Sequence, residues 1–444
     1  MKKIVVIGAG ESGFGAAVLA KAQGFDVLVS DNNAIAPKYK KQLADRDIPF
    51  EENGHSEDVI LAAREIVKSP GVPETVPIIQ KALLKGIPVI SEIEFAGRYS
   101  TAGMICITGS NGKTTTTLLT YHILKNAGLN VGLAGNVGNS FAYQVATEKH
   151  DYYVIELSSF QLDGMIDFKA DIAVLLNITP DHLDRYGFVF QNYINSKFRI
   201  TQNQSSEDTF IYFADDPVIQ KEMAKRKIPA GKIPFSAEKC PAEPSVCLRD
   251  NTIQFNLKNK FNMSVQDLAL QGSHNAYNSM AAGAIAQVLR IKKESIRNSL
   301  MDFKNVEHRL EPVVKVHGID FINDSKATNI NSAWYALESI NTKIVWIVGG
   351  IDKGNDYSQM EDLVKEKVKA IVCLGKDNHR IHEAFDGKVE SIVDTQSMKD
   401  AVTSAYYLAK DGDTVLLSPA CASFDLFDNY EDRGSQFKSA VRSL

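Results

Sequence analysis

The chain has 444 residues, of which 44% are hydrophobic and 23% are charged, and its formal net charge is −5. This length is long for a single hydrophobic core, so we expect two or three domains of an ordinary globular protein. The acidic balance argues against a nucleic-acid binder, which usually presents a basic face, and no run approaches the roughly 18 apolar residues of a membrane-spanning helix.

The first block, residues 1–99, alternates short β-like runs with helical patterns, as a mostly parallel α/β domain does. The first apolar run stops at a glycine-rich turn, which fits a β-strand better than a signal peptide. The predicted strands cover residues 4–7, 27–30, 66–68 and 89–90, and the predicted helix covers residues 13–23.

The glycine-rich turn, residues 8–15, has the GxGxxG spacing, and Asp31 ends the next predicted strand. This pattern is typical of dinucleotide-binding turns, so a nicotinamide-dependent oxidoreductase is one hypothesis. A plain tight turn in a parallel sheet is the alternative, and Glu11 would repel a diphosphate if it pointed inward. The turn at residues 69–73 also follows a strand, and a nucleotide-linked substrate lying along this edge fits both turns.

The most informative stretch is residues 104–116, where an apolar β-like run leads into a glycine turn and then into a helical pattern. The N–H groups of such a turn bind phosphate, a lysine reaches the outer phosphates and a threonine hydroxyl ligates Mg²⁺. Lys113 and Thr114 stand at those positions. Ile107 occupies the place of the first glycine in the usual pattern, so the bare motif is a near miss. Its strand and helix context nevertheless predicts an ATP site.

Polar residues also follow later strands of the second block, residues 100–303. Glu156 ends an apolar strand where a second Mg²⁺ ligand belongs, although it fits a helix cap equally well. His182 lies in another such polar turn. Lys197 falls inside a helical pattern, where the residue alone predicts a solvated side chain. Residues 203–262 lack clear periodicity and are expected to form a β-containing insertion.

The third block, residues 304–444, repeats the alternation of strands and helices. Polar groups follow its strands at residues 323–329, 349–354 and 418–425, each compatible by itself with an ordinary turn. Because α/β sheets bind ligands at the carboxyl ends of strands, we expect these groups to line a site. The predicted strands cover residues 319–322, 343–350, 370–374 and 414–417, and the predicted helices cover residues 357–368 and 398–409.

The five cysteines show no CxxC spacing. Cys106, Cys373 and Cys421 lie in or beside apolar runs, which predicts buried free thiols in a reducing compartment. We therefore expect a cytoplasmic protein.

Several motifs occur in the order seen in the Mur ligase family, which the chain therefore resembles over essentially its whole length. They are residues 109–114, 135–138, 156–161 and 181–184, Lys197, and residues 272–278. The family pattern T-G-x-N-G-K-T has no glycine at the position of Ile107. The resemblance implies an α/β protein of three domains. These are a Rossmann-like UDP-substrate-binding domain (1–99), a central P-loop-type ATP-binding domain with a mostly parallel sheet (100–303) and a Rossmann-like amino-acid-binding domain (304–444).

By this resemblance the protein binds ATP and two Mg²⁺ ions. Lys197 is expected to be carbamylated, which turns a cation into an anionic oxygen ligand for the metal. The expected catalytic residues are Lys113, Glu156, His182 and Lys197, and the expected metal ligands are Thr114, Glu156, His182 and Lys197. The expected ATP-binding residues are Gly109, Ser110, Asn111, Gly112, Lys113, Thr114, Thr115, Asn275, Asn278, Arg309 and Asp324.

The C-terminal motifs most resemble those of family members that join D-glutamate to UDP-N-acetylmuramoyl-L-alanine (UDP-MurNAc-L-Ala). The Asp-Asn-Pro-Arg type motif of the diamino-acid ligases is absent from the sequence. Tyr430 stands where the resemblance implies a phenylalanine. The expected substrate-binding residues are Ser12, Asp31, Asn32, Ser69, Gly71, Asn136, Ser158, Lys326, Thr328, Lys353, Ser423 and Phe424.

The implied reaction is ligation through an acyl phosphate, in the synthesis of peptidoglycan precursors, with domain closure that excludes water. Another Mur-type amino-acid ligase is the first alternative. A nicotinamide-dependent oxidoreductase leaves residues 104–444 unexplained, and a non-catalytic ATP-driven binding protein would lack amino-acid-dependent turnover. We expect a monomer whose partners are small molecules.

Overall fold

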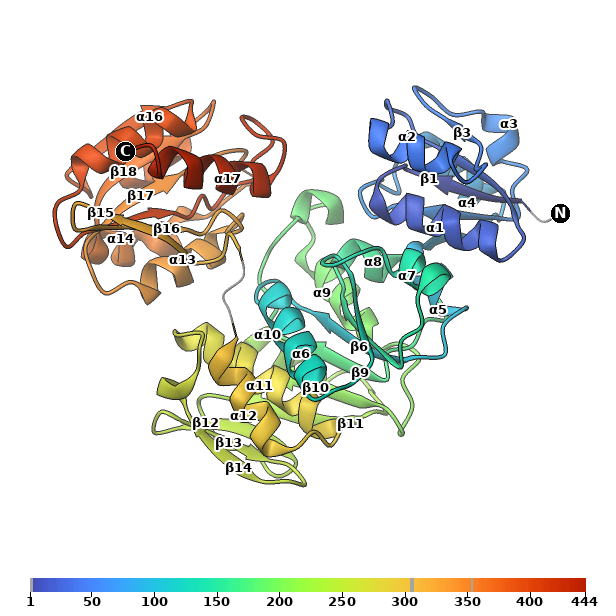
Figure 1. Ribbon diagram of the computed structural model, residues 1–444, viewed down its shortest axis with the longest axis horizontal. Coiled ribbons are helices and arrows are strands. Elements are labelled where there is room, and N and C mark those ends of the chain that lie inside the picture. Colours follow the sequence, from blue (N-terminus) through green and yellow to red (C-terminus); the bar gives the residue numbers. More distant parts are fainter. Residues whose placement is uncertain (1–2, 304–306, 353) are drawn as a thin grey trace. The chain divides into compact units, whose positions relative to one another are not determined.

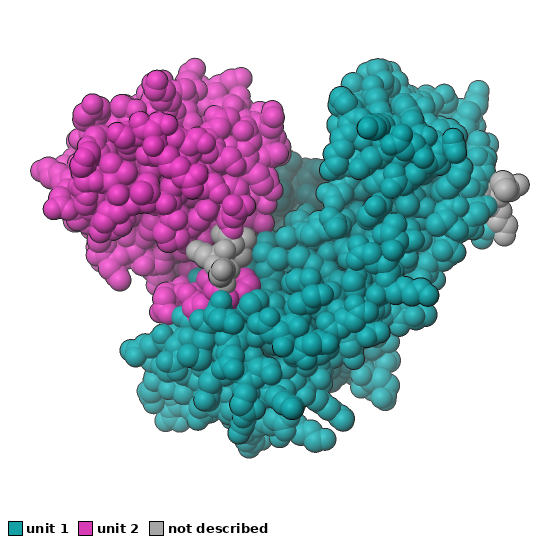
Figure 2. All heavy atoms as spheres, in the orientation of Figure 1, with its two compact units in different colours: residues 1–268, 275–302 teal, residues 269–274, 303–444 magenta. Residues whose placement is uncertain are grey.

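The computed structural model describes residues 3–303, 307–352 and 354–444, whose strands form three mostly parallel sheets with helices packed on them (Figure 1). The chain divides into two compact units, drawn in different colours in Figure 2: residues 1–268 with 275–302, and residues 269–274 with 303–444. The first two sheets belong to the first unit and the third sheet to the second. The predicted fold class, an α/β protein built on three mostly parallel sheets, is confirmed.

The first sheet is entirely parallel, with the strand order β3-β2-β1-β4-β5. Its central strand is an unbroken apolar run because both of its faces are buried: Val6 packs into one core and Val5 into another. The strands are β1 (Lys3–Ile7), β2 (Asp26–Ser30), β3 (Phe50–Glu51), β4 (Glu65–Lys68) and β5 (Val89–Ser91). The helices are α1 (Glu11–Ala22), α2 (Pro37–Ala44), α3 (Glu57–Ile60), α4 (Pro77–Leu84) and α5 (Glu92–Gly97). All four predicted strands are present, and β3 is additional.

The second sheet has nine strands in the order β14-β13-β12-β11-β10-β9-β6-β8-β7. Residues 203–262 supply strands at one edge of it, so the predicted β-containing insertion is confirmed. The strands are β6 (Gly103–Thr108), β7 (Val131–Gly135), β8 (Tyr152–Glu156), β9 (Ile172–Leu175), β10 (Thr209–Phe213), β11 (Gly231–Ser236), β12 (Ser245–Arg249), β13 (Thr252–Asn256) and β14 (Phe261–Ser264). Only the pairs β12–β13 and β13–β14 are antiparallel among the pairings of its described residues.

The helices of this segment include α6, which begins directly after the predicted phosphate loop. They are α6 (Lys113–Asn126), α7 (Phe141–Thr147), α8 (Ser159–Asp163), α9 (Phe190–Phe198), α10 (Pro217–Met223), α11 (Ser273–Val288) and α12 (Lys293–Asp302). Short 3₁₀ turns cover Leu183–Tyr186, Arg199–Thr201 and Val265–Asp267.

Helices α1 and α7 join the first two sheets into one unit with a shared hydrophobic core. The rings of Phe14 and Tyr143 stack with their centroids 5.7 Å apart. A Cβ atom at Gly15 would lie 1.9 Å from Ser140 Oγ, so glycine permits the close approach of these helices. The first sheet is thereby held against the central segment through α1.

The third sheet has the order β15-β16-β20-β17-β18-β19, and β15–β16 is its antiparallel pair. Successive side chains of β17 enter opposite cores: Trp346 packs with α13 to α15, and Val345 packs with α16 and α17. The strands are β15 (Glu311–Val316), β16 (Ile319–Asn323), β17 (Ile344–Val348), β18 (Val368–Leu374), β19 (Ser391–Thr395) and β20 (Thr414–Leu417). The helices are α13 (Ile330–Ser339), α14 (Glu361–Lys367) after a 3₁₀ turn at Tyr357–Met360, α15 (His379–Phe385), α16 (Met398–Leu408) and α17 (Tyr430–Val441). The helix predicted for residues 357–368 therefore begins as a 3₁₀ turn and ends one residue earlier than predicted.

Cys106, Cys373 and Cys421 are buried free thiols, as predicted. Cys240 and Cys247 form a disulfide, which the sequence analysis did not predict. Among the described residues, none of the helices combines the length and the apolar character that crossing a lipid bilayer requires.

Candidate active site

The predicted phosphate loop lies between β6 and α6, as the sequence indicates. Gly112 precedes the helix with φ +80°, a left-handed conformation that favours glycine. The ammonium group of Lys113 folds back over the loop and donates to the carbonyl groups of Gly109, at 2.9 Å, and Ser110, at 2.7 Å. Thr114 and Thr115 are buried in the first turn of α6. This strand, loop and helix form the backbone cradle that binds phosphate groups.

The loop is braced by a neighbouring segment that follows β9. Ser110 Oγ donates to the Thr179 carbonyl at 2.8 Å, and Thr179 N donates back to Ser110 Oγ at 2.9 Å. Asn111 N donates to Asn177 Oδ1 at 2.8 Å. Asn177 and Thr179 were not among the predicted site residues, although both belong to the same polar run as His182. These bonds fix the loop in its shape.

Asn278 on α11 approaches the start of α6. Its Oδ1 atom accepts a hydrogen bond from Thr116 Oγ1 at 3.1 Å, and its Nδ2 donates to Asn275 Oδ1 at 3.3 Å. A Cβ atom at Gly112 would lie 2.4 Å from Asn278 Oδ1. Two segments separated by more than 150 residues thus meet at the phosphate loop.

Strand β8 lies beside β6, with Glu156 in register with Ile107, so Glu156 emerges next to the phosphate loop. Glu156 is buried, and its Oε1 accepts from Asn136 Nδ2 at 2.8 Å. Its Oε2 is buried without a hydrogen-bond partner. Ser158 caps α8, so the alternative in which Glu156 caps this helix is excluded. A buried carboxylate oxygen of this kind suits a cation.

Lys197 on α9 is 1% exposed, which contradicts the solvated side chain predicted from the residue alone. Its Nζ atom donates to Thr108 Oγ1 at 3.1 Å. Burial, and then the positive charge of Lys113, lower the pKa of Lys197 well below its ordinary value of 10.5, whereas Asp181 and Glu156 act in the opposite direction. The structure therefore brings Lys197 into the electrostatic range of the phosphate loop and of Glu156.

His182 lies at the end of the polar run after β9, in a left-handed conformation with φ +51°. Its Nε2 is 3.6 Å from Asp181 Oδ2, and its ring meets the Phe160 ring edge-on with centroids 5.1 Å apart.

Ser158, an expected substrate-binding residue, caps α8: its Oγ accepts a hydrogen bond from the backbone N–H of Gln161. Ser158 is thus engaged in a structural role at this edge.

At the edge of the first sheet, Asp31 binds the glycine-rich turn. Its Oδ2 accepts from Ala9 N at 2.8 Å, and Ser69 Oγ donates to the Gly8 carbonyl at 3.0 Å. Glu11 Oε1 accepts from Ser140 N at 3.3 Å, so this carboxylate has a partner at α7. Of the other expected UDP-substrate residues, Asn32 and Gly71 are exposed and Ser12 is partly exposed.

In the second unit, polar residues at the ends of β16 and β20 meet as predicted. Asp324 is buried, and its two oxygens accept from Leu310 N at 3.1 Å and from Ser418 Oγ at 2.8 Å. Burial raises the pKa of Asp324 to about 7, against the opposing charge of Arg309. Arg309 Nε is buried without a hydrogen-bond partner. Burial, and then the charge of Arg309, also lower the pKa of His274 to about 4.

Arg433 on α17 links the segments that carry the expected amino-acid-binding residues. It is buried and donates to Ser325 Oγ at 3.0 Å, to the Ser325 carbonyl at 2.8 Å and to the Cys421 carbonyl at 3.2 Å. Lys326 Nζ lies over the Tyr430 ring, 5.0 Å from its centroid. Arg433 was not among the predicted site residues, because nothing in its local sequence indicates burial.

Other residues expected around the amino acid lie on the same segments. Thr328 is partly exposed before α13, Ser423 is buried and Phe424 is 69% exposed. Lys353 lies outside the described residues.

Three sequence models of Mur ligase domains match the chain. The MurD-like N-terminal domain matches residues 2–91, the Mur ligase middle domain matches residues 107–286, and the Mur ligase glutamate ligase domain matches residues 308–421. The chain therefore belongs to the Mur ligase family. This membership accounts for residues 104–444, which the oxidoreductase hypothesis left unexplained.

The chain is similar to two curated proteins named UDP-N-acetylmuramoylalanine–D-glutamate ligase. It is 62% identical to that of Bacteroides fragilis over 446 residues and 60% identical to that of Bacteroides thetaiotaomicron over 445 residues, in each case covering 100% of both chains. Among solved structures, UDP-N-acetylmuramate-alanine ligase MurC from Thermotoga maritima has a TM-score of 0.66 at 19% identity, with 100% of both chains covered. That similarity shows a shared fold.

Proposed function

We propose that this protein is an ATP-dependent ligase that joins D-glutamate to UDP-MurNAc-L-Ala and forms ADP and phosphate. The observation that carries the proposal is the 62% identity, over the whole of both chains, to a relative named for this ligation. The phosphate loop with Lys113 at its exit supports the use of ATP, because it has the form that binds a triphosphate.

The reaction activates a carboxylate, which is a poor electrophile. An oxygen of the alanyl carboxylate attacks the γ-phosphorus of ATP, and the bond between this phosphorus and the β,γ-bridging oxygen breaks. ADP departs, and the substrate is now an acyl phosphate. The neutral amine of D-glutamate then attacks the acyl carbon. Phosphate departs as the tetrahedral intermediate collapses, and the nitrogen loses one proton to solvent. Lys113 neutralises the charge that develops on the transferred phosphoryl group, and the N-terminus of α6 stabilises it, while Asn177 holds the N–H groups of Ser110 and Asn111.

The residues beside the loop fit magnesium. Thr114 supplies a hydroxyl and Glu156 supplies a buried carboxylate oxygen without a hydrogen-bond partner, which is the oxygen chemistry that Mg²⁺ prefers. When bound, the ion supplies positive charge that stabilises the phosphoryl oxygens. His182 is assigned to organising the metal or orienting the amine.

Carbamylation of Lys197 would add an anionic ligand to this site. Among the described residues of the first unit, no three ligand atoms from His, Cys, Asp or Glu gather within 4.8 Å of one another. A neutral lysine amine adds to CO₂ and releases one proton, forming a carbamate. The lowered pKa of Lys197 favours this neutral amine.

The remaining residues divide between the two units. In the first unit, Asp31, Ser69 and Asn136 are proposed to bind the UDP-linked substrate. In the second unit, Asp324 and Arg309 are proposed to contact the nucleotide. The proposed D-glutamate-binding residues are Lys326, Thr328, Ser423 and Phe424, together with Lys353.

A panel of amino acids tests this function. Phosphate release is measured with ATP and UDP-MurNAc-L-Ala in the presence of D-glutamate, L-alanine or L-lysine. We expect release and amide product with D-glutamate alone. Product with L-lysine or L-alanine instead would assign the chain to another Mur-type ligase, and phosphate release without any amino acid would contradict coupled ligation.

A further inference from the structure

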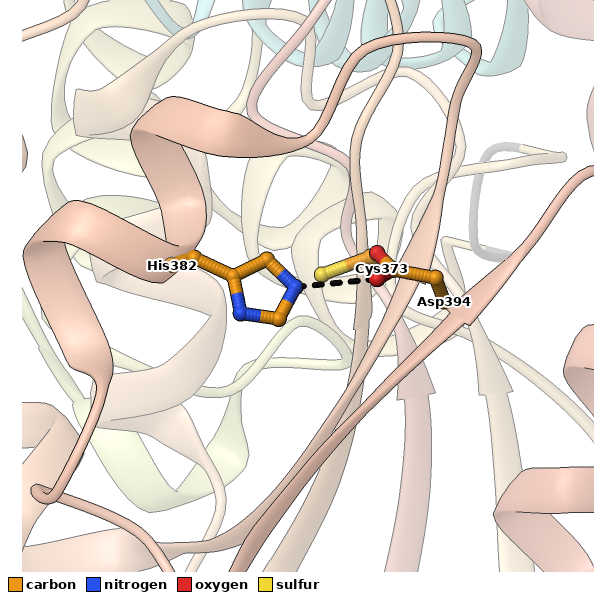
Figure 3. A group of neighbouring side chains, drawn as sticks. All are labelled: Cys373, His382 and Asp394. Atoms are coloured by element: carbon orange, nitrogen blue, oxygen red, sulfur yellow. Dashed lines mark hydrogen bonds and ion pairs between the residues drawn. The ribbon is translucent and has the colours of Figure 1, made fainter.

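A cysteine, a histidine and an aspartate converge at one edge of the third sheet, among residues to which the ligase reaction assigns no role. Cys373 on β18 and Asp394 on β19 are register partners of adjacent parallel strands, so their side chains point to the same face. His382 on α15 points its ring toward both (Figure 3). One ligand atom from each residue lies within 4.8 Å of the other two.

Neighbouring groups orient two of these side chains. His382 Nε2 is 3.1 Å from Asp394 Oδ2, while His382 Nδ1 is 3.2 Å from Asp386 Oδ1 on its other side. Asn378 Nδ2 donates to Asp394 Oδ1 at 2.9 Å. An imidazole with one nitrogen on a carboxylate and the other directed into a ligand cluster is the usual arrangement of a metal-binding histidine.

We propose that Cys373, His382 and Asp394 form a zinc site with three protein ligands and one open position. A thiolate with an imidazole and a carboxylate selects a borderline-soft ion such as Zn²⁺ over Mg²⁺. Zinc bonds of about 2.0–2.3 Å place tetrahedral ligand atoms roughly 3.3–3.8 Å apart. His382 Nε2 and Asp394 Oδ2, at 3.1 Å, are already near this spacing, and the Cys373 sulfur, within 4.8 Å of both, needs to approach by at most about 1.5 Å. Binding forms the zinc–sulfur bond as the thiol proton passes to solvent.

The open position has room for water or an exchangeable ligand. A surface cavity of about 580 Å³ adjoins the cluster and is lined by Lys376, Asn378, His382 and Asp394, among others. The cluster is contained within the second unit and within β18, β19 and α15, so zinc would cross-link these three elements. The inference depends on this geometry and is independent of the proposed ligase activity.

The experiment measures zinc in the full-length protein after EDTA treatment, incubation with one equivalent of ZnCl₂ and gel filtration. Cobalt(II) replaces zinc in a second measurement, since a thiolate–cobalt bond gives a charge-transfer absorption band. The test variants are Cys373→Ser, His382→Gln and Asp394→Asn. His379→Gln is the matched control on the same helix, and Cys106→Ser is the matched control for a buried thiol.

We expect the wild type and both controls to retain one equivalent of zinc and each test variant to bind it at least tenfold more weakly. The cobalt band should disappear in Cys373→Ser and persist in Cys106→Ser. Because His382 is half-buried and Asp394 is exposed, their variants should melt like the wild type without metal, which separates lost binding from lost folding. Substoichiometric zinc in the wild type, or equal binding by all variants, would overturn the proposal.

Discussion

Lys197 Nζ donates a hydrogen bond to Thr108 Oγ1 at 3.1 Å, and both residues are buried beside the phosphate loop. Thr108 Oγ1 in turn donates a hydrogen bond to the Leu157 carbonyl at 2.6 Å. A lysine buried against a hydroxyl loses hydration that this hydrogen bond only partly replaces. Such a placement favours the neutral amine and is typical of a side chain retained for chemistry.

Lys197→Met is predicted to abolish ligation while stabilising the protein. We expect activity to fall by about 100-fold or more, through loss of the proposed metal ligand. In CO₂-free buffer at pH 7 the free energy of unfolding should rise by ~1 kcal/mol or more, because the buried amine is removed. Denaturant unfolding and phosphate-release assays measure the two effects.

The lowered pKa of Lys197 also predicts how the stability of the protein changes with pH. Between the lowered pKa of the folded lysine and 10.5, the unfolded lysine keeps a proton that the folded lysine gives up. The stability of the wild type therefore rises with pH towards 10.5, and the advantage of Lys197→Met shrinks. A Met variant with full activity would contradict the proposed role of Lys197.

Gly112→Ala is predicted to weaken ATP binding by about tenfold or more, because the new methyl group meets Asn278 Oδ1 and strains the loop. Gly128→Ala at the other end of α6 is the control: its φ is +84°, but no heavy atom lies within 4 Å of the added Cβ. Both variants should lose about 1–2 kcal/mol of stability. Equal ATP affinity in the two variants would show that the contact with Asn278 does not matter.

Glu92→Gln is predicted to flatten the pH dependence of stability. Glu92 Oε1 accepts from Ser140 Oγ at 2.7 Å and from Ala142 N at 2.6 Å, and burial raises the pKa of Glu92 to about 7. Between pH 4.5 and 7 the folded state holds a proton on Glu92 that the unfolded state has lost. The stability that this bound proton provides is therefore lost as the pH rises through 7.

Relative to the wild type, Glu92→Gln should therefore gain about 1–3 kcal/mol of stability between pH 5 and pH 8. Urea unfolding at both pH values measures this gain. The exposed Glu57→Gln is the control, and its curve should parallel that of the wild type. A parallel curve for Glu92→Gln would show that Glu92 does not titrate in this range.

Arg433→Lys is predicted to raise the KM for D-glutamate by about tenfold or more. The substituted ammonium cannot reproduce the forked contacts of the guanidinium to Ser325 and Cys421, so the proposed amino-acid-binding segments lose their link. Initial-rate kinetics with varied D-glutamate measure the effect. Arg442→Lys on the exposed end of the same segment should leave KM unchanged, and an unchanged KM in Arg433→Lys would rule out the positioning role.

The sheets were predictable because buried parallel strands are apolar runs that end at polar turns. The positions of the phosphate loop, of Asp324 and of Ser418 were predictable for the same reason, because each follows an apolar strand. Short β3 was missed, since two residues carry no periodic signal. The helix predicted at residues 357–368 differs in its first turn, which is 3₁₀. Asp356 caps this turn, and its side chain accepts a hydrogen bond from Ser358 N.

The least predictable features are contacts between segments far apart in the chain. Asn278 reaches Gly112, and Arg433 reaches Ser325, over separations that no local pattern encodes. The burial of Lys197 depends on α9 packing against α8 and on the contact of its side chain with Thr108 at the end of β6, so the local sequence predicted it wrongly. The disulfide between Cys240 and Cys247 is a local feature, with the two residues seven apart, and it was missed because their spacing is not a CxxC pattern.

The central claim is that the terminal phosphoryl group of ATP passes to the substrate carboxylate before the amide forms. UDP-MurNAc-L-Ala labelled with ¹⁸O in its alanyl carboxylate tests this directly, by mass spectrometry of the phosphate released in the presence of D-glutamate. An acyl phosphate predicts that the released phosphate carries one ¹⁸O atom from the carboxylate. Amide product accompanied by unlabelled phosphate would contradict the account.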